Sequence, residues 1–226
     1  MRTLLRGGQI LDGAGAPAYR GDVRLNGDKI EAVGALSPLP DEQVINVSGC
    51  VVCPAFVDMH RHMDARPLLG DDMAVELRQG IATTAVGNCG FSLAPYGGAF
   101  AAEKRENDAP ILGRYPESFR FSFPEYLNAL EHSAPGMNLA ALIGLGAVRI
   151  SLTGFSDAPL SSSALNAARG MLQDALDAGA AGISAGIMYL PEYYTTRDEY
   201  RAMLAPLRGT GKPLVTHIRG EGDGLV

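Results

Sequence analysis

Two histidines stand two residues apart, directly after an apolar run. His60 and His62 follow residues 51–58, whose apolar character is typical of a buried strand. Residues i and i+2 of an extended chain point to the same side, so both imidazoles can face one point. Neutral imidazoles are common zinc ligands. Because short patterns recur by chance, the pair alone is equally compatible with a metal site and with two polar residues beyond a strand.

Cys89 and His217 occupy the same kind of position. Cys89 follows the apolar run 82–87, and His217 lies at the end of another, 213–218. A nearby metal would hold the thiol as thiolate, although most free cysteines are small buried hydrophobes, and a lone histidine there could be a core residue. Three of five predicted strands nevertheless end in a potential metal ligand, which favours one shared site.

The elements that would position these residues fall into two regions. Residues 1–52 contain short strand-like runs separated by glycines, with a strong hairpin signal at Asn26-Gly27-Asp28, and they predict a small β module that is part of a β-sandwich. Residues 53–226 predict about five β/α units of a (β/α)8 TIM-type barrel. The predicted parallel strands are 51–58, 82–87, 138–144, 182–187 and 213–218.

Helix-end signals separate these strands. Pro124 suits a first helical turn, Gly179 suits a C-terminal cap, and Thr196 with Glu199 has capping-box spacing. The apolar residues of 91–122 follow neither the spacing of a helix nor that of a strand, so this segment predicts a long inserted loop. A closed barrel needs eight strands and about 250 residues, so we expect a truncated, N-terminal portion of a barrel.

Composition favours small-molecule chemistry. The formal net charge is -6 and no run of Lys or Arg occurs, which argues against a nucleic-acid or anionic-membrane surface. No segment approaches the roughly 20 apolar residues of a membrane span, and the first residues lack a signal-peptide pattern. The predicted location is cytoplasmic, and unfinished barrel edges make an oligomer possible.

Two other features receive structural interpretations. Cys50 and Cys53 have C-x-x-C spacing but no second ligand pair, so we expect them to pack in an apolar interior. The 16 arginines are scattered along the chain, which is typical of a solvated surface.

Four stretches resemble, in the same order, the signatures of N-acyl-D-amino-acid deacylases. The resemblance runs from about residue 3 to the end, and Gly87 to Phe91 is its most specific part. The stretches are His60-Arg61-His62-Met63-Asp64, Val86-Gly87-Asn88-Cys89-Gly90-Phe91-Ser92-Leu93-Ala94-Pro95, Gly186-Ile187-Met188-Tyr189-Leu190-Pro191 and Thr216-His217-Ile218-Arg219.

The resemblance implies a β module packed on a barrel and a centre of one or two Zn²⁺ ions. His60 and His62 would be first-strand ligands, Cys89 a bridging thiolate and His217 a fifth-strand ligand. Related cyclic amidohydrolases bridge two metals with a modified lysine after the fourth strand, and residues 182–190 contain no lysine. That absence agrees with the role given to Cys89.

The resemblance also places residues outside this set. Tyr189 would face the substrate, whereas a further histidine and the general-base aspartate would lie beyond Val226, so the catalytic residue is unknown here. Leu145 stands where family members often have a histidine, which puts a polar contact from that position in doubt.

The implied function is metal-dependent hydrolysis of the linear amide of N-acyl-D-amino acids, giving a carboxylate and a D-amino acid. The partner would be this small molecule, with no nucleic acid and no membrane, and the chain alone would be inactive. Two alternatives stay open: a dihydroorotase-like or hydantoinase-like enzyme of cyclic amides or dipeptides, and a non-catalytic remnant of the fold.

Overall fold

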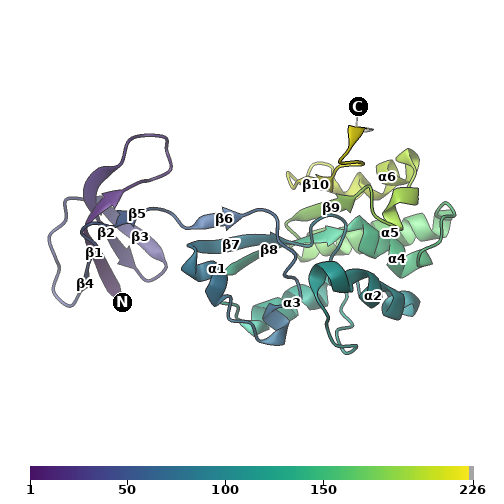
Figure 1. The fold of residues 1–226 in the computed structure, drawn as a ribbon, viewed down its shortest axis with the longest axis horizontal. Coiled ribbons are helices and arrows are strands. Elements are labelled where there is room, and N and C mark those ends of the chain that lie inside the picture. The colour runs from purple at the N-terminus through teal and green to yellow at the C-terminus, as the bar shows by residue number, and fades with distance from the viewer. Residues whose placement is uncertain (224–226) are drawn as a thin grey trace. The chain divides into compact units, whose positions relative to one another are not determined.

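The structure, a computed structural model, describes residues 1–223. The chain forms two compact units, Met1–Ala55 and Phe56–Val226, which are drawn in Figure 1. Among the described residues, no helix combines the length and the apolar character needed to cross a membrane.

The first unit is a mixed sheet of five strands. Its strands are β1 (Arg2–Ile10), β2 (Tyr19–Asn26), β3 (Lys29–Gly34), β4 (Gln43–Asn46) and β5 (Val51–Val52). The order is β3-β2-β1-β4, and β5 pairs with β1. The β2–β3 hairpin confirms the predicted turn, because Asn26 pairs with Lys29 and Gly27 has a φ of 61°.

The second unit contains an all-parallel sheet that forms half of a barrel. Its strands are β6 (Phe56–Asp58), β7 (Ile81–Val86), β8 (Asn138–Gly144), β9 (Gly182–Gly186) and β10 (Leu214–His217). They follow one another in chain order across the sheet, from β6 at one edge to β10 at the other (Figure 1). The predicted α/β fold class, a partial barrel preceded by a small β module, is therefore confirmed.

One predicted strand was wrong in extent. The run 51–58 is two strands, of which β5 belongs to the first sheet and β6 to the second. Pro54 lies between them and cannot donate a backbone hydrogen bond, so the ladder is interrupted there.

The helices of the second unit lie between the parallel strands. They are α1 (Ala74–Arg78), α2 (Ala101–Leu112), α3 (Phe123–Ser133), α4 (Leu145–Thr153), α5 (Ser162–Ala178) and α6 (Arg197–Met203), with short 3-10 turns η1 (Pro67–Leu69), η2 (Gly98–Phe100), η3 (Glu192–Tyr194) and η4 (Ala205–Leu207). The predicted end signals are confirmed: Gly179 caps α5 in a left-handed conformation, and Thr196 with Glu199 forms the capping box of α6.

The long loop predicted at 91–122 contains a helix, α2, and the prediction was wrong in that respect. The residues that α2 buries do have helical spacing, but Lys104 and Asp108 are among them. Their Nζ and Oδ2 atoms lie 2.5 Å apart, so the two charges pair inside the protein. Because charged residues occupy inward positions, the apolar periodicity of this helix is hidden in the sequence.

The core of the second unit lies between the parallel sheet and α5. Leu172 and Ala175 of α5 are fully buried and belong to the same apolar cluster as Ile143 of β8 and Ile183 of β9. Tyr126 of α3 is also fully buried there, and its hydroxyl donates to the carbonyl of Asp64 at 3.0 Å. This packing holds the strands whose ends carry the candidate ligands.

Two surface expectations were wrong. Cys50 and Cys53 are both exposed, since β5 is only two residues long and leaves its flanks uncovered. Arg149 is fully buried, with Nη1 at 3.3 Å from Glu199 Oε1. The arginines therefore do not all lie on a solvated surface, because a buried acid can hold a guanidinium in the interior.

Candidate metal centre

His60, His62 and Cys89 come together at the carboxyl ends of β6 and β7. One ligand atom from each residue lies within 4.8 Å of the other two. Cys89 Sγ is 3.2 Å from His60 Nε2, and the two imidazole centroids are 5.3 Å apart. Cys89 is 4% exposed, so its sulfur faces this cluster and not solvent.

His217 joins the cluster through Cys89. It is the last residue of β10, and its Nδ1 lies 3.7 Å from Cys89 Sγ. Its other ring nitrogen, Nε2, lies 3.2 Å from Glu221 Oε1 and 3.5 Å from the hydroxyl of Tyr189. All four sequence-predicted ligands thus meet at one end of the sheet, with Cys89 between the histidines of the two edge strands.

Glycines allow the loop that carries Cys89 to approach the sheet closely. Cys89 itself has a left-handed φ of 57°, and Gly87 and Gly90 have φ values of 78° and 74°. A Cβ at Gly87 would overlap the carbonyl oxygen of Leu142, and one at Gly90 would lie 2.7 Å from the nitrogen of Gly186. Only glycine fits both positions without moving β8 or β9.

Ser184 of β9 forms hydrogen bonds with the same loop. Its hydroxyl accepts a hydrogen bond from the Gly90 N–H at 3.1 Å and donates to the carbonyl of Gly87. Ser184 is fully buried. The Ser184 hydroxyl thus bonds to the loop on both sides of Cys89, at Gly87 and at Gly90.

The residues present fit a metal ion of the zinc type. Nδ1 of His62 is buried and has no hydrogen-bond partner among the described residues. Burial, followed by repulsion from His60 and His217, lowers the pKa of His62, which favours the neutral form that binds metals. Two imidazoles and a thiol that converge on one point form a donor set that zinc accepts.

Cys89 needs a cation to ionise. Burial raises the pKa of its thiol, and the negative charges of Glu192 and Glu221 add to the effect. Without a positive charge nearby, this sulfur stays protonated and is a poor nucleophile. The environment suits a metal ligand better than an independent catalytic thiolate.

Two buried charged residues near the cluster were missed in the sequence. Lys104 is fully buried and donates to the carbonyl of Ser92, two residues after Gly90, at 2.7 Å. Glu192 is 2% exposed and accepts from the N–H of Gly186 at 2.8 Å, and burial raises its pKa to about 7. Lys104 pairs with Asp108 four residues later, a spacing that is also common on exposed helix surfaces, and no sequence pattern marks Glu192 as buried.

Leu145 follows β8 and Tyr189 follows β9, the two strands next to β7 on the side of β10. The ring of Tyr189 packs 5.1 Å from Phe91 and 4.8 Å from His217, measured between centroids. Leu145, the first residue of α4, is fully buried. Its apolar side chain therefore supplies no polar contact to the cluster.

Comparison with known proteins places the chain in a family. Residues 43–225 match the amidohydrolase family. The D-aminoacylase of Alcaligenes xylosoxydans xylosoxydans is 35% identical over 226 residues, which cover 99% of this chain and 45% of that protein. The chain thus spans less than half of this curated relative.

Solved structures of the same kind of protein also match the chain. A crystal structure of D-aminoacylase that defines a novel subset of amidohydrolases matches with a TM-score of 0.88 and 36% identity over 98% of this chain and 46% of that one. The N-acyl-D-glutamate deacylase of Bordetella bronchiseptica, in complex with zinc and a phosphonate inhibitor that mimics the tetrahedral intermediate, matches with a TM-score of 0.84 and 32% identity over 99% and 46%. These matches confirm the predicted resemblance to the N-acyl-D-amino-acid deacylases. The chain belongs to the amidohydrolase family.

Proposed function

We propose that the protein to which these residues belong hydrolyses the linear amide of N-acyl-D-amino acids with the help of zinc. The products would be a carboxylate and a free D-amino acid. The observation that carries this proposal is the convergence of His60, His62 and Cys89 within 4.8 Å. Relatives named as deacylases of D-amino acids support the substrate class.

The proposed ligand set is supported by the geometry of the cluster. His60, His62 and Cys89 would hold the ion, and His217 would reach it or a second ion from the far side of the sulfur. When bound, such an ion lowers the pKa of a water molecule to about 7 and polarises the substrate carbonyl. Because Cys89 contacts both His60 and His217, we propose it as a ligand of one ion or as a ligand that two ions would share.

Other residues of the chain would shape the surroundings. Phe91 and Tyr189 pack edge to face beside the cluster and would exclude water from one side of it. The hydroxyl of Tyr189 lies close to His217 Nε2, where it could donate to a substrate oxygen. We propose Tyr189 as a substrate-binding residue on this ground.

The experiment compares three classes of substrate in the natural protein that contains residues 1–226. Release of free amine is measured from N-acetyl-D-amino acids and their L-enantiomers, and ring opening is measured with a hydantoin and with dihydroorotate. Cleavage restricted to the D-acyl compounds, lost after chelation and restored by zinc, is the expected result. Ring opening alone would identify a cyclic amidohydrolase instead.

A pair of cysteine variants provides the internal control. Cys89→Ala should abolish most activity and zinc binding, whereas Cys50→Ala should keep both, since Cys50 is exposed. Absence of all hydrolysis in a protein that still binds zinc would favour a non-catalytic remnant of the fold. Absence of both would refute the proposed function.

A further inference from the structure

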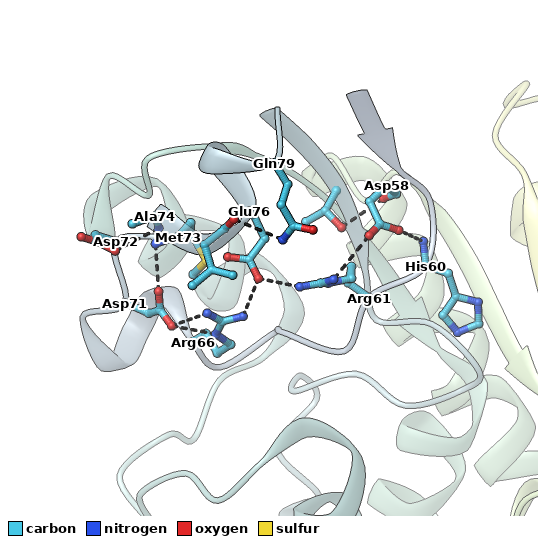
Figure 2. A network of polar contacts seen from close by, with 12 residues as sticks. Asp58, His60, Arg61, Arg66, Asp71, Asp72, Met73, Ala74, Glu76 and Gln79 are labelled. Atoms are coloured by element: carbon cyan, nitrogen blue, oxygen red, sulfur yellow. Dashed lines mark hydrogen bonds and ion pairs between the residues drawn. The ribbon is translucent and has the colours of Figure 1, made fainter. Parts of the chain in front are cut away.

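Glu76 of α1 links two arginines next to the segment that carries His60 and His62. Its Oε1 accepts hydrogen bonds from Arg61 Nη2 at 2.5 Å and from Arg66 Nη1 at 2.8 Å. Figure 2 shows Glu76 between the two guanidinium groups. Glu76 is 1% exposed, so this carboxylate is held inside the protein by the two cations.

Arg61 separates the two histidines in the chain. Successive side chains of an extended segment point to opposite sides, which sends Arg61 away from the imidazoles and toward α1. Its backbone is fixed as well: its N–H donates to the carbonyl of Ala85 at 3.1 Å, and its carbonyl accepts from Asn88 Nδ2 at 3.2 Å. Both the backbone and the side chain of Arg61 are therefore bonded to neighbouring parts of the protein, between His60 and His62.

Asp58 completes a path of contacts from Glu76 to a histidine. Its Oδ2 lies 3.6 Å from Arg61 Nη1, and its Oδ1 accepts from the backbone N–H of His60 at 3.1 Å. Figure 2 shows Asp58 and His60 at one end of this network and Asp71 at the other. Within residues 1–223, Arg61 is the member of segment 60–62 whose side chain bonds to Glu76.

The far end of the network is anchored in α1 and the turn before it. Arg66 contacts Asp71 Oδ2 through Nε at 2.7 Å and through Nη2 at 2.6 Å. Asp71 Oδ1 also accepts from the N–H of Met73, just before α1 begins. These contacts tie Arg66 to the turn before α1, beside the carboxylate of Glu76.

We propose that Glu76 is a positioning residue for the metal centre. Through Arg61, its carboxylate holds the segment 60–62 so that both imidazoles point at Cys89. This inference rests on the proposed metal centre. Partners that orient metal ligands in other proteins change metal affinity by about 10-fold to 100-fold when removed.

The test compares zinc affinity in the chain and in two matched variants, by competition with a chromophoric chelator. Glu76→Gln keeps the shape of the side chain but removes its charge, and we expect zinc to bind about 10-fold to 100-fold more weakly. Glu42→Gln is the control, because Glu42 makes a similar pair with Arg24 at 2.6 Å in the first unit. It should bind zinc like the unchanged chain.

Cobalt gives a second measurement that general destabilisation would not alter. The visible absorption of bound Co²⁺ depends on the geometry of its ligands, so it should shift in Glu76→Gln and stay unchanged in Glu42→Gln. If Glu76→Gln does not fold, Arg61→Met breaks the same path at a side chain that is 34% exposed, and the same loss is expected from it.

The outcomes separate the two proposals. If the unchanged chain binds no zinc, the proposed function fails. If it binds zinc and Glu76→Gln or Arg61→Met binds zinc and cobalt identically, the proposed function survives and the role of Glu76 is refuted. A variant that carries both Glu76→Gln and Arg61→Met should lose no more zinc affinity than one of the single variants, since both substitutions act on one path.

Discussion

Cys89 Sγ lies 3.7 Å from Nδ1 of His217, although two strands of the sheet lie between β7 and β10. Cys89 comes after β7 and His217 ends β10, with β8 and β9 between them in the sheet. The contact is possible because the Cys89 loop crosses the carboxyl ends of β8 and β9, fastened to Ser184. The sulfur can therefore touch ligands from both edges of the sheet.

Zinc should stabilise the folded chain measurably. An ion that binds only the native state at 100 times its dissociation constant adds about 2.7 kcal/mol to the free energy of unfolding. We expect a higher melting temperature with zinc, reversed by a chelator, in the unchanged chain and in Cys50→Ala. An equal zinc effect in Cys89→Ala would contradict the ligand assignment.

Gly90→Ala should destabilise the protein and weaken zinc binding. A left-handed φ costs a non-glycine residue about 1–2 kcal/mol, and the new Cβ would also lie 2.7 Å from the nitrogen of Gly186. Gly70→Ala is the matched control, because Gly70 is left-handed, with a φ of 82° and a ψ of 18°, and nothing lies within 4 Å of its Cβ position.

Urea unfolding measures the difference between these two glycine variants. We expect Gly70→Ala to lose about 1 kcal/mol and Gly90→Ala to lose at least about 2 kcal/mol more, because of the overlap. Equal losses would mean that the loop is free to move away from β9.

Lys104→Met should cost about 3–5 kcal/mol of folding free energy. The substitution leaves the buried carboxylate of Asp108 without its cation, and breaking a buried pair from one side has a cost of this size. Tyr115 would remain as a donor to Asp108 at 2.6 Å. Lys29→Met, at a side chain that is 81% exposed, should change stability by less than about 0.5 kcal/mol.

The pair can be tested further by removing both charges. Lys104→Met with Asp108→Leu should recover much of the loss, since replacing a buried ion pair by apolar residues is often neutral. No recovery in thermal or urea unfolding would show that Lys104 acts mainly through its bond to the carbonyl of Ser92.

Protonation of Asp22 should make the first unit less stable in acid. Hydrogen bonds from the N–H groups of Leu36 and Gly7 lower the pKa of its carboxyl group below the ordinary value. A folded pKa below the unfolded one stabilises the protein above the unfolded pKa, and this contribution is lost as pH falls through the folded pKa. The loss is therefore expected below about pH 4.

Hydrogen exchange of the Gly7 and Leu36 amides is the suitable measurement. In the unchanged chain their protection should hold above about pH 4 and fall as the pH drops further, after correction for intrinsic rates. Asp22→Asn should show weak protection above and below that pH. Protection that does not depend on pH in the unchanged chain would contradict this role of Asp22.

Periodicity and turn chemistry predicted most of the fold. The hairpin at Gly27 and the caps at Gly179 and Thr196 depend on neighbours within four residues, so the sequence shows them directly. Helix α2 was missed because Lys104 and Asp108, which pair with each other inside the protein, read as surface residues. Their four-residue spacing is equally typical of an ion pair on an exposed helix surface, so it does not show that this pair is buried.

The same distinction applies to the candidate centre. Each of the four candidate ligands lies at or just after the end of a predicted strand, and the ends of parallel strands meet at one edge of a sheet. This is how the sequence identified His60, His62, Cys89 and His217. Glu76 was missed because nothing near it in the sequence marks a partner, and its contact with Arg61 spans 15 residues. Supporting contacts of this kind emerge only from the folded arrangement.

The central claim is that Cys89 and the histidines bind one metal centre, and X-ray absorption at the zinc edge tests it most directly. The account predicts a zinc–sulfur distance of about 2.3 Å together with nitrogen ligands at about 2.0–2.1 Å. In Cys89→Ala the sulfur shell should disappear, whereas in Cys50→Ala it should persist. Zinc surrounded only by nitrogen and oxygen in the unchanged chain would contradict the claim.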